Sequence, residues 1–461
     1  MKKRIAAIST RIGHEFKLMW DSNEKWLNRK TPFNLFLIYA LPIAIFQGIL
    51  SIFHINSTDA LWQWQQIDGS VPFSDVMPVG HTLYMWCFKW IGGLATYNVV
   101  QVIIFVIVVT LCLLFFARRG ISKTLLLIIT CVYAVSNAFT VVSTGTKDAP
   151  YSIAILVLTM LCIKIYETRA EILKKGKYII SIGIVLALIT LFRHNGGLVT
   201  IGTFLVLLIF YPKYFLRILL SAIVSVGLVA IVWGFAFGVM KAAPDDFNYI
   251  SLAMLKPVFA VVAQDGNISQ EQLDFINTQA MPIDIIKQYY DPYSFGNFIW
   301  SSSENFIFGE PISDNPQTTT SIFATTHYME VKQLFFDLFP QNKEIMIKDI
   351  VKTRAYIYNL WWSNEGYIGN FGNWGPTHGQ YMLALVVLLL YLGFKRKKWR
   401  SFIIFAPVFL NIISILITLT PEWRYTWPTG LCFPMILLFF VGEVRKKKDV
   451  LAEERSLHNN V

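Results

Sequence analysis

Charged residues and cysteines are both scarce in this sequence. Only 15% of the 461 residues are charged, against about a quarter in a soluble domain, and 55% are hydrophobic. The five cysteines form no CxxC pair, and four of them lie inside apolar runs, where a thiol behaves as a small hydrophobe. This pattern argues against a disulfide framework and against a zinc site.

Apolar runs dominate instead, and several approach the roughly 20 residues that cross a bilayer. They predict an all-α polytopic membrane protein with about ten transmembrane helices, at 33–53, 98–117, 122–142, 151–166, 178–192, 197–211, 216–239, 379–394, 401–419 and 424–442. Residues 1–30 hold no apolar stretch followed by a small-residue cleavage site, so we do not expect a cleavable signal peptide.

The distribution of basic residues predicts the orientation in the membrane. Most of the 40 Lys and Arg fall in both terminal segments and in alternate short loops such as "ARRGISK" and "FKRKKWR", and such loops are usually cytoplasmic. Both termini are therefore expected in the cytoplasm. The net charge of +11 is accounted for in this way and does not indicate nucleic-acid binding.

Composition divides the chain into five parts. Apolar residues recur at helical spacing among basic ones near the N-terminus, from Ile5 to Trp20, which predicts a helix lying on the inner leaflet. A long external segment carries more acidic than basic residues and predicts a small mixed folded domain. The expected parts are a cytoplasmic amphipathic segment 1–32, a transmembrane module 33–240, an external domain 241–377, C-terminal transmembrane helices 378–443 and a cytoplasmic tail 444–461.

Charged side chains gather at the predicted external helix ends. Ionisable groups at the depth of a membrane are costly and usually face a cavity or a partner, so four such sites on one face predict a shared polar cavity opening outward. The residues are Asp59, Asp75, Lys147, Asp148, Arg193, His194, Glu422 and Arg424.

Each of these residues also has a structural interpretation. An acid at Asp59, after Ser57 and Thr58, would complement a helix dipole, and Asp75 would suit a turn. Lys147 and Asp148 would form a local ion pair. In the same way, Arg193 and Arg424 would reach lipid headgroups, while His81 would be a satisfied buried residue.

The combination favours chemistry on a lipid-linked phosphate. Arginine binds phosphate oxygens bidentately and stays charged, and a nearby carboxylate can take a proton from an acceptor hydroxyl. Arginine or a divalent metal would stabilise the leaving phosphate. A transporter usually keeps its charges near the midplane in repeated halves, and no such repeat is visible.

The order of short motifs resembles the C-type (GT-C) polytopic glycosyltransferases, which include protein mannosyltransferases and oligosaccharyltransferases. The similarity is closer still to the poorly characterised multi-pass glycosyltransferase-like proteins of Gram-positive bacteria. It extends over most of the chain and rests on "PVGHTLY", "TKDAPY", "FRHNGG", "YYDPYSFGN" and "EWRYTWP".

The resemblance implies inverting transfer of a sugar from a polyprenyl-phosphate donor to a cell-envelope acceptor, outside the cytoplasm. It makes Asp59 the general base and Asp148 a second acid that positions the acceptor or a divalent metal. Arg193 and Arg424 would bind the donor phosphate, with Lys147 and His81 as further phosphate ligands. Asp59 has no neighbouring acid, unlike the mannosyltransferase pattern, so Asp75 is an alternative base and the metal stays open.

Two other functions compete with this interpretation. One is a polysaccharide polymerase or ligase, which relies more on external arginines than on an acid after the first helix. The other is a transporter or flippase for a lipid-linked sugar. The sequence does not identify the sugar, the acceptor or the oligomeric state.

Overall fold

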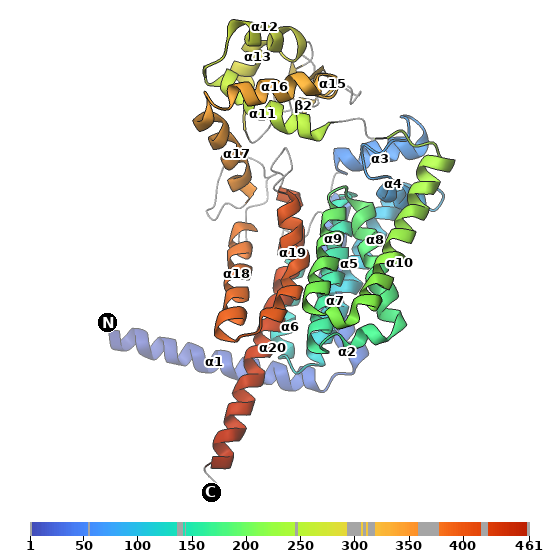
Figure 1. Ribbon diagram of the computed structural model, residues 1–461. Helices are drawn as coiled ribbons and strands as arrows, with labels where there is room; N and C mark the ends of the chain where they lie inside the picture. Colours follow the sequence, from blue (N-terminus) through green and yellow to red (C-terminus); the bar gives the residue numbers. More distant parts are fainter. Residues whose placement is uncertain are drawn as a thin grey trace.

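The computed structural model is built almost entirely of helices (Figure 1). It describes residues 2–53, 56–135, 142, 144–244, 248–292, 306–307, 310–311, 319–357, 378–415 and 423–458.

A helix occupies each of the ten runs predicted from hydropathy. They are α2 (Pro32–Phe53), α5 (Gly93–Ala117), α6 (Lys123–Val135), α7 (Asp148–Glu167), α8 (Gly176–Phe192), α9 (Gly196–Phe210), α10 (Phe215–Trp233), α18 (His378–Leu390), α19 (Phe402–Ile415) and α20 (Trp427–His458). Two continue as π-helices, α10 into η4 (Gly234–Val239) and α18 into η5 (Tyr391–Lys395).

Five of the described helical segments are long and apolar enough to cross a membrane: Pro32–Ser51, Gly93–Ala117, Asp148–Glu167, Pro212–Val239 and Trp427–Val444. The other apolar helices have 10–17 residues. The chain is thus a helical membrane protein, whereas the number of about ten crossings stays a prediction.

The buried share of each span shows where it lies in the bundle. Within the span Asp148–Glu167, 72% of the most apolar window is buried, against 22% within Pro212–Val239. The helix α7 is therefore central, and α10 is peripheral. Large apolar side chains along α10, such as Leu216 and Ile223, are exposed as expected for contact with lipid.

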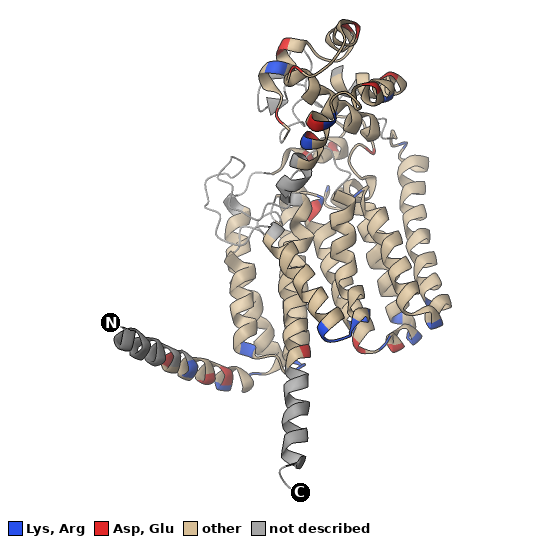
Figure 2. Ribbon diagram, turned by 60° about the vertical axis from the view of Figure 1, so that its left-hand side comes forward, with Lys and Arg blue, Asp and Glu red and all other residues tan. Residues whose placement is uncertain are grey.

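Short helices complete both ends of the bundle. Between α2 and α5 lie α3 (Thr58–Asp68) and α4 (Val79–Trp86), and α3 lies across the upper end of the bundle in Figure 1. The turns on the opposite side contain η2 (Glu171–Lys174), η3 (Pro212–Tyr214) and η6 (Trp399–Ser401). In Figure 2, charged residues of the bundle gather at its lower end, and the middle parts of its helices are uncharged.

The segment expected as an external domain forms a second hydrophobic core, separate from that of the bundle. Its helices are α11 (Tyr249–Ala263), α12 (Gln270–Gln279), α13 (Ile283–Tyr289), α15 (Thr319–Thr326), α16 (Tyr328–Leu338) and α17 (Lys343–Ile357). Within the described residues the only strands are β1 (Phe306–Ile307) and β2 (Glu310–Pro311), an antiparallel pair with Phe306 opposite Pro311. The described part of this segment is thus mostly helical.

Candidate active site

The first functional segment is the start of α3. Ser57 caps this helix, because its Oγ accepts a hydrogen bond of 3.1 Å from the backbone N–H of Ala60. Asp59 lies in the first turn, where a carboxylate complements the partial positive charge of the exposed N–H groups. The structural interpretation of Asp59 is therefore correct as far as its position is concerned.

Asp59 also has a cationic partner from another segment. Lys147 donates to Asp59 Oδ2 at 2.6 Å and to Met77 Sδ at 3.0 Å. Both charged side chains are mostly buried, with 17% of Asp59 and 12% of Lys147 exposed. Lys147 therefore pairs across the fold, and the expected local pair between Lys147 and Asp148 is wrong.

The loop that carries Lys147 is pressed against the start of α3. Ser57 N–H donates to the Thr144 carbonyl at 3.0 Å. Gly145 has a φ of +75°, and a Cβ added to it would lie 3.0 Å from Ala60 Cβ and from Asn98 Oδ1. Glycine is required here by both its left-handed backbone and the lack of space, so the glycine of "STGTKD" positions Lys147.

Asp148 begins α7 and forms a second, more deeply buried ion pair with Arg193, which follows the last residue of α8. Only 1% of the Asp148 side chain and 9% of the Arg193 side chain are exposed. Arg193 Nε also donates to Asn195 Oδ1 at 3.0 Å. The side chains of Asp148 and Asn195 therefore hold the guanidinium in place.

Aromatic rings enclose the same guanidinium. Its Cζ lies 4.3 Å from the centroid of the Tyr425 ring and 5.5 Å from that of Tyr151. Tyr151 donates to Asn411 Oδ1 at 2.8 Å, and Asn411 in turn donates to the Tyr425 carbonyl at 3.2 Å. This connects α7, α8, α19 and the 3₁₀ turn η7 (Trp423–Thr426).

The turn between α8 and α9 depends on a second glycine, Gly196. Its N–H donates to the Arg193 carbonyl at 2.9 Å. A Cβ at Gly196 would lie 1.9 Å from the Ile189 carbonyl oxygen, so no larger residue fits. Asn195 completes the turn by donating to Ser414 Oγ of α19 at 2.7 Å. The "RHNGG" motif therefore ties three helices together.

Asp75 serves as a turn residue and also faces a histidine. Its Oδ1 accepts from the N–H of Val79, the first residue of α4, at 2.9 Å and lies 3.4 Å from His194 Nε2. Its backbone N–H donates to the Ala243 carbonyl at 2.8 Å. Asp75 thus joins the first loop to the segment that leads to the external domain.

His81 is completely buried and does not suit the predicted role of a phosphate ligand. Burial, reinforced by the positive charge of Lys147 and opposed by Asp59, lowers the pKa of His81 to about 3, so the ring is neutral at pH 7. Its Nδ1–H donates to Gln63 Oε1 at 2.9 Å, and its Nε2 accepts from the Tyr97 hydroxyl at 2.7 Å. A neutral ring with both nitrogens in use cannot supply charge to a donor phosphate.

Two predicted elements lie partly outside the described residues. The side chain of Arg424 and the whole of Glu422 lie outside the described residues. In "YYDPYSFGN", Tyr290 belongs to the second core, where its hydroxyl donates to Asp349 Oδ1 at 2.8 Å. Residues 293–297 of this motif lie outside the described part.

The described donor set does not fit a metal ion. The residues that the structure describes contain no group of three His, Cys, Asp or Glu side chains placed to bind one. Asp148, the expected ligand, is engaged by the Arg193 guanidinium, and Asp59 is engaged by the Lys147 ammonium. We therefore derive no step through a metal.

Several residues of the cluster were not predicted from the sequence. Asn411 and Ser414 lie inside a predicted apolar run and read as ordinary membrane-helix residues, and Tyr151 ends the quoted motif "TKDAPY" without a role assigned to it. Asn195 and Tyr425 were within quoted motifs, but no role was assigned to them. The pairing of an arginine with a ring two or more helices away leaves no local signal in the sequence.

No protein-family model matches the sequence, and no curated protein matches it. Two solved structures of the oligosaccharyltransferase of Archaeoglobus fulgidus are similar in shape, each with a TM-score of 0.42. One is the apo form, at 12% identity over 94% of this chain, and the other is AglB with an inhibitory peptide and a dolichol-phosphate, at 15% identity over 95%. The alignment covers 52% of each of those chains, so this chain spans about half their length.

Proposed function

We propose that this protein is a membrane glycosyltransferase. It transfers a sugar, with inversion, from a polyprenyl-phosphate donor to a hydroxyl of a cell-envelope glycan on the extracytoplasmic side. The observation that carries the proposal is the convergence of two carboxylate–cation pairs from three separate segments: the start of α3, the start of α7 with Lys147 before it, and the end of α8. Burying four charges is costly, so such an arrangement favours a functional site.

Asp59 is the general base in this proposal. It is the more accessible of the two paired acids, with 17% of its side chain exposed against 1% for Asp148. The acceptor oxygen attacks the anomeric carbon while the bond from that carbon to the phosphate oxygen breaks. The hydroxyl proton passes to Asp59, and the polyprenyl phosphate leaves with the electron pair.

Lys147 links the proton transfer to the departure of phosphate. While Asp59 is a carboxylate, it neutralises the ammonium at 2.6 Å. Once Asp59 takes the proton, that ammonium loses its counter-charge at the moment when negative charge develops on the leaving phosphate. The pair thus acts as one unit.

Arg193 is the second cation in this proposal. Asp148, Asn195 and the Tyr425 ring hold its guanidinium in one orientation, which is what recognition of a phosphate geometry requires. Asp148 positions Arg193 rather than the acceptor. Arg424 is a further phosphate ligand in this proposal, and that role rests on the resemblance alone.

The competing functions predict other arrangements. A transporter places its charges near the middle of the spans, whereas Asp148 begins α7 and Arg193 follows the end of α8. A polymerase or ligase that depends on arginines would not need the Asp59–Lys147 pair. We therefore prefer the transferase, and the loss of Asp59 separates it from both.

The test is glycosyl transfer by the purified protein in nanodiscs, with a panel of polyprenyl-phosphate sugars and a cell-envelope acceptor extract. Wild type should transfer, and Asp59→Asn should lose about 10²–10⁴-fold in rate. Asp68→Asn is the matched control, because Asp68 is an exposed acid of the same helix that accepts only from Ser70.

Equal rates in wild type and Asp59→Asn would overturn the assignment of the base and direct the search to Asp75. Movement of lipid-linked sugar by wild type without any transfer would overturn the enzyme and favour the transporter.

A further inference from the structure

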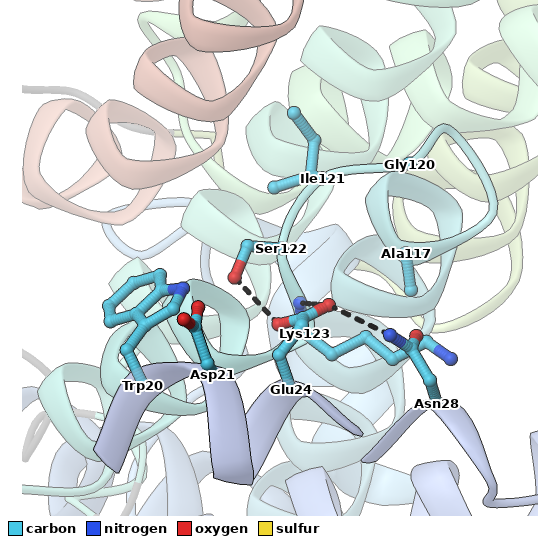
Figure 3. Close-up of a pocket in the computed structure, with 9 residues that line it drawn as sticks. All are labelled: Trp20, Asp21, Glu24, Asn28, Ala117, Gly120, Ile121, Ser122 and Lys123. Atoms are coloured by element: carbon cyan, nitrogen blue, oxygen red, sulfur yellow. Dashed lines mark hydrogen bonds between the residues drawn. The ribbon is translucent and has the colours of Figure 1, made fainter. Parts of the chain in front are cut away.

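The helix α1 (Lys2–Asn28) takes no part in the proposed chemistry and lies across the lower end of the bundle (Figure 1). It is held there by Glu24, which points toward the start of α6 (Figure 3). The Glu24 carboxylate accepts from the N–H groups of Lys123 and Thr124 at 3.2 and 3.0 Å, and from the Ser122 hydroxyl at 2.8 Å.

These bonds outweigh the burial that opposes them, and they lower the pKa of Glu24, so the carboxylate stays ionised at the N-terminus of α6. Leu27, fully buried one turn later, packs into the core of the bundle. The angle of α1 to the bundle is therefore fixed.

The contact with α6 also fixes the depth of α1. Its partners lie in the turn that follows α5, a candidate span ending at Ala117. Arg118 and Arg119 open this turn, as expected where a span leaves the hydrocarbon. The helix α1 thus lies at the level of lipid headgroups and runs along the membrane plane.

One side of α1 is apolar and uncovered. Met19 and Trp26 are seven residues apart and therefore on one side of the helix, and they are 55% and 50% exposed. In the sequence, Ile5, Ile8 and Ile12 continue the same helical spacing toward the N-terminus. Half or more of the surface of each of these two side chains is thus left uncovered by the described part of the chain, although large apolar groups are usually buried.

The segment is also strongly basic. Residues 2–30 contain eight Lys and Arg but three Asp and Glu. Lys17, Lys25 and Arg29 are exposed, and the Lys30 ammonium lies 4.2 Å from the centroid of the Trp26 ring. An apolar stripe beside a basic one, parallel to the membrane, is complementary to an anionic lipid surface.

We propose that α1 binds the surface of an anionic phospholipid leaflet. Met19 and Trp26 enter the boundary between headgroups and acyl chains, and Lys17, Lys25 and Arg29 contact lipid phosphates. The Glu24 clamp holds the helix at the height where both contacts are made.

The test uses the full chain with its five cysteines replaced and a nitroxide on Met19→Cys or, as the comparison site, on Lys25→Cys. The protein is placed in nanodiscs of phosphatidylcholine with or without phosphatidylglycerol, one chain per disc. Spin relaxation by oxygen, relative to a water-soluble nickel complex, reports immersion. We expect position 19 to be immersed and position 25 to be accessible to nickel when phosphatidylglycerol is present.

Charge dependence is tested by a triple variant, Lys17→Gln with Lys25→Gln and Arg29→Gln. Each basic residue near an anionic surface changes the partition coefficient by roughly fivefold, so the triple variant should lower the equilibrium constant for immersion of α1 roughly a hundredfold. Lys343→Gln, an exposed site in the external domain, is the control that should change nothing. Unchanged gel-filtration and thermal profiles show that the variants are folded.

Equal immersion in neutral and anionic discs would overturn the role of charge. Nickel accessibility at position 19 equal to that at position 25 in every lipid would overturn the whole proposal. Protection that appears only with two chains per disc, independent of lipid, would assign the apolar stripe to a second copy instead.

Discussion

Separating the stability of the buried Asp148–Arg193 pair from its function is the sharpest test of the site. Asp148→Asn leaves a guanidinium that cannot lose its proton, 9% exposed, without its counter-ion. Arg193→Gln leaves a carboxylate that is 1% exposed. Removing one partner of a buried pair costs about 3–5 kcal/mol, because the remaining charge is uncompensated.

The double variant, Asp148→Asn with Arg193→Gln, removes both charges and should recover most of this loss. The expected coupling between the two sites is about 2 kcal/mol or more. Sugar transfer should be lost both in Arg193→Gln and in the double variant. The double variant should therefore regain stability without regaining activity.

The free energy of unfolding would be measured by denaturant titration in detergent, with a thiol-reactive dye that reports exposure of the buried Cys112, Cys162 and Cys432. Cys87 and Cys131 are exposed and would be replaced first. Glu167→Gln is the matched control, because it removes one partner of a more exposed pair with Arg119 and should cost at most about 1 kcal/mol. The reasoning would be refuted if each single variant lost less than about 1 kcal/mol in the free energy of unfolding and the two losses simply added in the double variant.

Three further predictions concern neighbouring residues. Lys147→Gln should lower kcat more than it raises KM, and combining it with Asp59→Asn should cause no additional loss in a transfer assay, because the pair acts as one unit. The pKa of His81 lies at about 3 in the folded protein and near 6.5 unfolded, so the unfolded state binds more protons as pH falls below 6.5. Below about pH 6.5 the free energy of unfolding should therefore fall by about 1.4 kcal/mol per pH unit because of His81. Denaturant titrations at pH 7 and pH 5 should show a smaller difference in the free energy of unfolding for His81→Gln than for wild type. Gly145→Ala should cost about 1–2 kcal/mol or more from its left-handed backbone and its contact with Ala60, measured by the same titration, with unchanged stability contradicting the described loop.

The helices were predictable because lipid imposes length and apolarity on each run independently. Boundaries differ mainly where polar residues extend a helix beyond its apolar part. One example is α5, which begins at Gly93 rather than 98, because the helix extends over residues 93–97, which include the polar Thr96 and Tyr97. The N-terminal helix α1 was likewise predictable, from the helical spacing of its apolar residues.

The pairing of charges was not predictable from the sequence. Lys147 and Asp148 are neighbours, but successive residues at a helix start point about 100° apart, so one reaches α3 and the other reaches Arg193. The resemblance made His81 a candidate phosphate ligand, while the residues alone also allowed a satisfied buried histidine, and the structure has the buried one. Its burial depends on packing against Gln63 and Tyr97, which only the tertiary fold specifies.

The Glu24 clamp sets an order of events during synthesis. Glu24 and Thr124 are 100 residues apart in the chain, so α1 leaves the ribosome long before its anchoring partner exists. Until α6 has been made and inserted, Glu24 lacks these partners, and they do not yet fix the angle of α1 to the bundle. Docking of α1 therefore reports that the hairpin of α5 and α6 has been completed with the correct sidedness. A chain whose α6 inserted in the opposite direction would leave Glu24 without these partners, so α1 would not dock.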